Sequence, residues 1–244
     1  MIALISDIHS NFEALEAVLD VLEARGVRNL ACLGDIVGYG PQPSECIAAL
    51  RSWSQAICIQ GNHDAALLGT LDSTGFNENA KKAIDINRTQ LGADDRRFLK
   101  ALPLTAEAEG VLLFHGSPTH PLEEYLKSPT AIHTAFRVVE GRWIAVGHTH
   151  DPLLIFMDSE GKLGARQPEG DQIYPLAPDR RYLMNVGSVG QPRDGDPRAC
   201  ATILDPESGT MEYIRVPYDV AATQKKMRAL GFPEYLGSRL GKGQ

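Results

Sequence analysis

Two histidines separated by a single residue, His148 and His150, follow the short apolar run at residues 143–147. A turn with two polar residues explains such a pair, and so does a metal site, because neutral imidazole is the commonest metal ligand in proteins. The two explanations differ in what they require elsewhere in the chain. A metal site requires further ligands at positions that the fold brings to the same place.

Four other segments repeat this arrangement, in which an apolar run leads into a loop with a side chain able to bind a metal. The residues concerned are Asp7, His9, Asp35, Asn62, His63 and His115. Five of the seven histidines of the chain, those at 9, 63, 115, 148 and 150, follow such runs, a clustering that scattered structural histidines do not produce. Ligands of open α/β sheets gather outside the carboxyl ends of the strands, so we expect these side chains to meet at one edge.

The chemistry of this set points to two metal ions and a phosphate ester. It offers two carboxylates, four imidazoles and one amide oxygen, from Asp7, Asp35, His9, His115, His148, His150 and Asn62. A set without cysteine excludes a thiolate site and suits Mn, Fe, Zn, Co or Ni. Seven donors exceed the needs of one tetrahedral zinc. They fit two divalent ions about 3.5–4 Å apart, which leave a cationic surface for an oxyanion.

Composition narrows the class of partner. A net charge of −7, with 24 basic residues in 244, disfavours duplex nucleic acid. The chain has no apolar run of about 20 residues, and its start, MIALISDIHS, lacks the basic region of a signal peptide. The four cysteines form no CxxC pair, which is typical of a reducing compartment. We expect a cytoplasmic protein that binds a small phosphate ester and no membrane, with its oligomeric state left open.

Strands and helices that must position these residues are expected to alternate in the first half of the chain. Apolar runs predict strands, and helical spacing predicts the segments between them. Strands are expected at 2–6, 29–33, 56–60, 110–114 and 143–147, and helices at 12–26, 44–53, 76–102 and 130–141, the third of them polar. Strands that alternate with helices form a parallel sheet covered by helices.

After residue 150 the pattern changes to short β runs separated by turn residues. The stretch DPESG at 205–209 predicts a hairpin, and residues 220–231 predict a final helix. We find neither a repeat nor a linker. A single domain spanning residues 1–244, with two packed sheets, is the simplest organisation.

The motifs, taken in order, resemble those of the calcineurin-like metallophosphoesterase family. They are the DxH, GD, GNHD, single His and GHTH motifs, at residues 7–9, 34–35, 61–64, 115 and 147–150. The later stretch NVGSVGQPRDGDPRA, residues 185–199, resembles an element of the small bacterial and archaeal phosphodiesterase members. The resemblance covers nearly the whole chain. It implies an α/β (α+β) fold, a four-layer αββα sandwich of two mixed sheets flanked by helices.

The resemblance also implies a role for each residue. One metal ion would be held by Asp7, His9, Asp35 and His150, and the other by Asp35, Asn62, His115 and His148. Asp35 would bridge them. A hydroxide between the ions would attack phosphorus, and His63 would act as the general acid that protonates the leaving oxygen.

One departure from the family pattern limits the range of substrates that we expect. Protein phosphatases and symmetrical dinucleoside tetraphosphatases of the family have GDxVDRG, where this chain has GDIVGYG with Gly38 and Tyr39. The second aspartate, which pairs with the general-acid histidine, and the phosphate-binding arginine are therefore absent. Candidate substrate contacts are Asn11, Tyr39 and Arg193. The loops at 39–45, 69–76 and 116–128 are expected to set specificity.

The sequence therefore predicts a metal-dependent phosphodiesterase acting on a small diester. Alternatives within the same chemistry are a phosphomonoesterase and a dinucleoside polyphosphate hydrolase. Two further alternatives do not involve this chemistry. One is a catalytically silent scaffold of the same fold, and the other is a protein that binds a single metal ion. All seven ligand positions are filled, which favours an enzyme over a scaffold.

Overall fold

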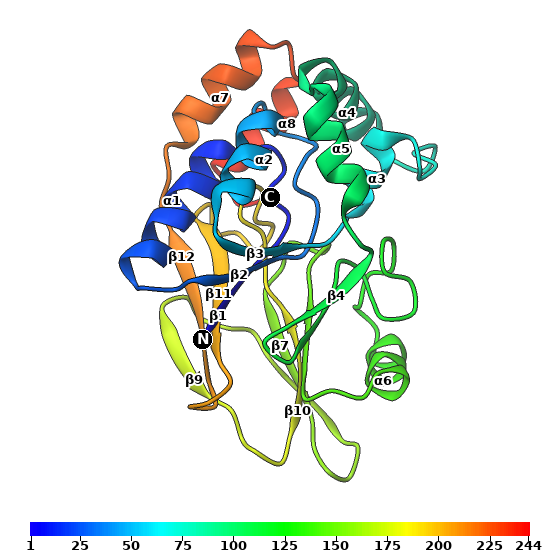
Figure 1. Cartoon of the computed structure of the whole chain (residues 1–244), viewed down its shortest axis with the longest axis vertical. Helices are drawn as coiled ribbons and strands as arrows, with labels where there is room; N and C mark the ends of the chain where they lie inside the picture. The colour runs from blue at the N-terminus through cyan, green and yellow to red at the C-terminus, as the bar shows by residue number, and fades with distance from the viewer.

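Two six-stranded β-sheets lie face to face in the computed structural model, which describes residues 1–244 (Figure 1). The first sheet contains, in spatial order, β3 (Gln55–Cys58), β2 (Asn29–Cys32), β1 (Ile2–Ile5), β11 (Ala199–Asp205), β12 (Thr210–Val216) and β9 (Gln172–Pro175). Strands β1, β2 and β3 run parallel, whereas β11, β12 and β9 pair in antiparallel fashion. The β11–β12 hairpin turns at the predicted stretch 205–209.

The second sheet is also mixed. Its spatial order is β4 (Thr105–Ala108), β5 (Val111–Phe114), β6 (Trp143–Val146), β10 (Arg181–Asn185), β7 (Leu153–Met157) and β8 (Leu163–Arg166). Strands β5, β6 and β10 run parallel, and the other pairings are antiparallel. The carboxyl ends of the parallel strands are the places from which the predicted ligands emerge.

The central strands are apolar throughout because both of their faces are buried. In β1, Ile2 and Leu4 point into the core between the sheets, where they join residues of the second sheet such as Leu113 and Met184. The alternate residues of β1, Ala3 and Ile5, belong to the core beneath the helices. The period of two along a strand produces this division.

Helices cover the outer face of each sheet, which completes the predicted αββα sandwich. Helices α1 (Phe12–Ala24) and α2 (Pro43–Ser52) pack on the first sheet. Helix α6 (Pro129–Val138) packs on the second through Ile132 and Phe136. The remaining helices are α3 (Asn62–Leu68), α4 (Glu78–Gln90), α5 (Ala93–Ala101), α7 (Val220–Ala229) and α8 (Glu234–Leu240), all in the upper part of Figure 1. None of the helices combines the length and the apolar character needed to cross a membrane.

Five parts of the chain differ from the sequence-based expectation. The predicted helix at 76–102 is two helices, α4 and α5, because Gly92 interrupts it and Asp95 accepts a hydrogen bond from the Gly92 amide, which starts the second. Helix α7 is not the last, since α8 follows it. Strands β4 and β9 and helix α3 were not predicted, because each is short and none has a clear hydrophobic period.

Candidate active site

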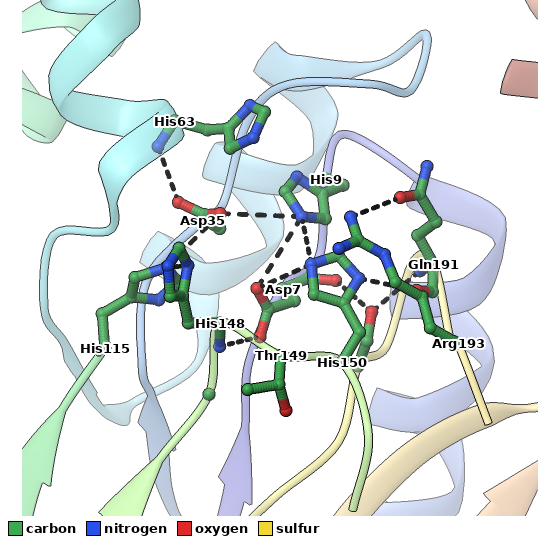
Figure 2. A network of polar contacts seen from close by, with 12 residues as sticks. Asp7, His9, Asp35, His63, His115, His148, Thr149, His150, Gln191 and Arg193 are labelled. Atoms are coloured by element: carbon green, nitrogen blue, oxygen red, sulfur yellow. Dashed lines mark hydrogen bonds and ion pairs between the residues drawn. The ribbon is translucent and has the colours of Figure 1, made fainter. Parts of the chain in front are cut away.

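The seven predicted ligands meet between the two sheets, at the carboxyl ends of strands. Figure 2 labels six of them, all but Asn62. Asp7 and Asp35 follow β1 and β2 of the first sheet. His115, His148 and His150 follow β5 and β6 of the second. All seven are buried, with at most 7% of each residue exposed. The site therefore depends on the packing of one sheet against the other.

One group of donors surrounds Asp7. The Oδ1 atom of Asp7 lies 3.1 Å from Nε2 of His150 and 3.7 Å from Nε2 of His9. The two imidazole nitrogens are 3.1 Å apart. Asp7, His9 and His150 thus form a set whose ligand atoms lie within 4.8 Å of one another.

A second group surrounds His115. Its Nε2 lies 2.9 Å from Oδ1 of Asn62 and 3.1 Å from Nδ1 of His148. Asp35 lies between the two groups, with Oδ2 at 3.5 Å from Nε2 of His115 and 3.6 Å from Nε2 of His9. A single carboxylate oxygen therefore faces both sets.

Backbone carbonyl groups fix which nitrogen of each ring points inward. The Nδ1–H groups of His9, His115 and His150 donate to the carbonyls of Val37, Leu33 and Gln191, at 3.1, 2.9 and 2.7 Å. His148 is turned around, and its Nε2–H donates to the carbonyl of Glu123 at 3.3 Å. Second hydrogen bonds of this kind orient metal-binding histidines and leave the other nitrogen as an acceptor.

These contacts fit a pair of divalent cations. Burial is the largest cause that lowers the pKa of each of the four imidazoles, to about 3 for His148, so the rings are neutral and able to bind a metal. Two acceptor nitrogens that face each other at 3.1 Å, as in His9 and His150, repel unless a cation lies beside them. Oδ1 of Asp7 is also buried without a hydrogen-bond donor. A metal ion between His9, His150 and Asp7 would satisfy these three groups together.

The carboxylates of Asp7 and Asp35 each accept a hydrogen bond from a backbone amide in another loop of the site. Oδ2 of Asp7 accepts a hydrogen bond from the amide of His148 at 2.9 Å, and Oδ1 of Asp35 accepts one from the amide of His63 at 2.8 Å. The close approach behind the first bond requires a glycine. A Cβ atom at Gly147 would lie 2.0 Å from Oγ of Ser6 and 2.7 Å from Oδ2 of Asp7.

The backbone is strained where the site is formed. Nine residues other than glycine have a positive φ, and they include Asp7, His9, Asp35, His148 and His150. Such conformations are uncommon for these side chains and persist only where the surrounding structure imposes them. Five of the nine such residues are therefore predicted ligands, which lie in the loops that follow the strands.

His63 lies next to the two groups, beside the rings of His9, Tyr39 and Phe76. Its Nδ1 is buried and has no hydrogen-bond partner, and a Cβ atom at Gly38 would lie 2.5 Å from it. Gly38 therefore leaves room for the ring where other family members are expected to place an aspartate. His63 also forms a third possible set of ligands with His9 and Asp35.

The three candidate substrate contacts differ in how far they are free to bind. All four hydrogen-bonding positions of Asn11 are occupied, by Ala14, Thr223, Gly190 and Tyr218, and its oxygen caps helix α1. Arg193 lies beside His150 (Figure 2), with its buried Nε free of any partner. Tyr39 is buried against His9 and His63 and lines the cavity described next.

A cavity of about 530 Å³ opens beside the metal-ligand groups. His63, His148 and Asn62 form its inner end, and Phe76, Glu123 and Tyr125 lie in the loops at 69–76 and 116–128. These loops were expected to set specificity, but the individual residues were not identified, because loop sequences have no period that reveals direction. Asn87 lies in helix α4, and it was missed because a polar residue within a polar helix gives no sign that its side chain is buried against a loop. Its side chain joins Ser10, Gly38 and Gly40, and so holds the loop that carries Tyr39.

Comparisons with known proteins identify the family of this chain. Residues 1–209 match the calcineurin-like phosphoesterase superfamily domain. The uncharacterized protein MJ0912 of Methanocaldococcus jannaschii is 40% identical over 250 residues, which cover 100% of this chain and 98% of that protein.

Two solved structures have the same fold. A metallophosphoesterase from Sphaerobacter thermophilus is 37% identical with a TM-score of 0.87, and the match covers 100% of this chain and 98% of that one. The hypothetical protein PH1004 of Pyrococcus horikoshii OT3 is 22% identical with a TM-score of 0.80. That match covers 100% of this chain and 99% of the other chain, and it supports the fold alone. With the motifs in order and the ligand groups assembled, the chain belongs to the calcineurin-like phosphoesterase superfamily, a family of metal-dependent hydrolases of phosphate esters.

Proposed function

We propose that this chain, folded as one domain, is a phosphodiesterase that uses two divalent metal ions to hydrolyse a small phosphodiester. The observation that carries the proposal is the position of Asp35 Oδ2, 3.6 Å from Nε2 of His9 and 3.5 Å from Nε2 of His115. A carboxylate oxygen between two sets of neutral imidazoles suits a bridging ligand. Manganese, iron, zinc, cobalt and nickel all accept such nitrogen and oxygen donors.

We assign Asp7, His9, Asp35 and His150 to one ion, and Asp35, Asn62, His115 and His148 to the other. When bound, such ions polarise the phosphoryl oxygens and supply a nucleophilic water near neutral pH. The protein holds the donors in place through the backbone carbonyls that fix each imidazole. All seven positions are filled and oriented, which argues against a catalytically silent scaffold.

His63 is assigned as the group that donates a proton to the leaving oxygen. It lines the cavity beside the ligand groups, so a leaving group in the cavity lies next to its ring. Burial is the main cause that lowers the pKa of His63, with contributions from His150 and Arg193. An anionic phosphate placed between these groups favours the protonated ring. Arg193, beside His150, is assigned to a phosphoryl oxygen.

A diester is favoured over a monoester because Arg193 is the one arginine beside the ligand groups, whereas the second negative charge of a phosphate monoester calls for further cations. The test is hydrolysis of bis(p-nitrophenyl) phosphate and p-nitrophenyl phosphate with each of the five metals, together with elemental analysis of the protein. We expect two ions per chain and a higher kcat/KM for the diester. A preference for the monoester would favour a phosphomonoesterase, and no turnover of either ester with any metal would contradict the proposal.

A further inference from the structure

The cavity beside His63 has an aromatic wall. Phe76 lies with its ring centre 5.0 Å from that of His63, and Tyr125 stacks on His148 with ring centres 4.0 Å apart and planes inclined by 16°. The ring centre of Tyr39 lies 4.5 Å from that of His63, with the two planes inclined by 46°. Aromatic rings therefore adjoin both histidines at the inner end of the cavity.

Tyr125 presents part of its ring to the cavity and to solvent. Its residue surface is 49% exposed, although it sits beside a buried candidate ligand. Phe76 is half-buried and also lines the cavity. Pockets for small ligands are lined mainly by apolar and aromatic side chains, and aromatic rings stack on flat ligands.

The charge of the cavity distinguishes two kinds of leaving group. Neither lysine nor arginine lines it, whereas Asp72 and Glu123 do. Two cations lie over aromatic rings of the wall without lining the cavity themselves: Nζ of Lys127 is 5.3 Å from the ring centre of Tyr125, and Cζ of Arg193 is 5.9 Å from that of Tyr39. A chain of further phosphates needs several cations, and this cavity offers carboxylates instead.

We propose that the cavity binds the leaving group of the substrate as a flat, uncharged aromatic group of the size of a nucleoside, rather than as a further phosphate. The proposal rests on the phosphodiesterase function above, since His63 can protonate only a leaving oxygen beside it. A volume of about 530 Å³ lies in the range of cavities that enclose small ligands. The substrate class that fits is a diester of a nucleoside, and a dinucleoside polyphosphate does not.

Binding of adenosine alone tests the cavity without catalysis. Saturation-transfer NMR should detect adenosine on the protein and not ribose. Tyr125→Ala and Phe76→Leu, the second of which keeps an apolar side chain in the core, should each weaken adenosine at least about fivefold, as expected for the loss of one stacking contact. Tyr235→Ala, in helix α8 and outside the cavity, should bind adenosine as the unaltered protein does. Equal binding of adenosine and ribose, or unchanged affinity in both variants, would overturn the proposal.

Catalysis provides the second test. Adenylyl-(3′→5′)-adenosine and glycerophosphoglycerol are both diesters with alcohol leaving groups, and only the first has flat bases. With manganese we expect about tenfold higher kcat/KM for the dinucleotide, a ratio that Tyr125→Ala reduces. Equal values, or faster hydrolysis of diadenosine tetraphosphate, would overturn the proposal and leave the phosphodiesterase function standing. Absence of turnover with these esters and with bis(p-nitrophenyl) phosphate would instead contradict the phosphodiesterase function.

Discussion

The Nε2 atoms of His9 and His150 face each other at 3.1 Å in the interior of the protein. Each ring donates its Nδ1–H to a backbone carbonyl, so neither Nε2 has a proton to share. Protonation of one ring would remove the repulsion, but burial lowers the pKa of both. A metal ion is the remaining means of satisfying the pair, and this relationship leads to the first prediction.

Removal of divalent metal should destabilise the protein. A ligand that binds only the folded state at 100 times its dissociation constant adds about 2.7 kcal/mol. For a chain of this size about 2–4 °C of Tm corresponds to each kcal/mol, so EDTA should lower the Tm by about 5–10 °C, as measured by scanning calorimetry. Added manganese should restore it. A Tm that EDTA leaves unchanged in the unaltered protein, and that manganese does not raise, would show that these groups bind no metal.

Pairs of alanine variants should show that His148 and His150 serve different ions. His150→Ala is expected to lose the ion near Asp7, and His148→Ala the ion near Asn62, so each retains about one ion by elemental analysis. The combination His9→Ala with His150→Ala removes two ligands of one ion and should still retain about one. The combination His148→Ala with His150→Ala should retain none. Equal stoichiometry in the two double variants would contradict the assignment.

The sequence predicted the site more fully than the elements around it. Side chains such as Asp7 and His115 could be identified because each follows an apolar run, and the carboxyl ends of strands converge by topology alone. The break at Gly92 has a local signal, the glycine followed three residues later by the capping Asp95, which the prediction of one long helix overlooked. Helices α3 and α8 have seven residues each, too few to show a helical period. Tertiary contacts that single-chain patterns do not carry determine the carbonyls of Val37 and Gln191, which fix the histidines, and Phe76 and Tyr125, whose direction no loop sequence encodes.

Replacement of Gly147 by alanine, Gly147→Ala, should lower the free energy of unfolding of the protein. A Cβ atom there would lie 2.0 Å from Oγ of Ser6 and 2.7 Å from Oδ2 of Asp7, in a region without free space. Overpacking of this kind costs about 1–3 kcal/mol, and displacement of Asp7 should weaken one metal site as well. Gly237→Ala is the matched control, because its Cβ would meet nothing closer than 3.9 Å and alanine favours the helix. Urea unfolding of both variants measures the difference, and equal stability would contradict the packing argument.

Replacement of His63 should separate proton donation from metal binding. A general acid contributes about 10²–10⁴-fold, so we expect His63→Ala to reduce kcat by that amount on an alkyl diester while two ions remain bound. The loss should be smaller for bis(p-nitrophenyl) phosphate, because p-nitrophenolate leaves without a proton. The position of His63 near His9 and Asp35 also permits a role as a ligand. Loss of an ion in the variant, with equal effects on both esters, would assign His63 to the metal instead.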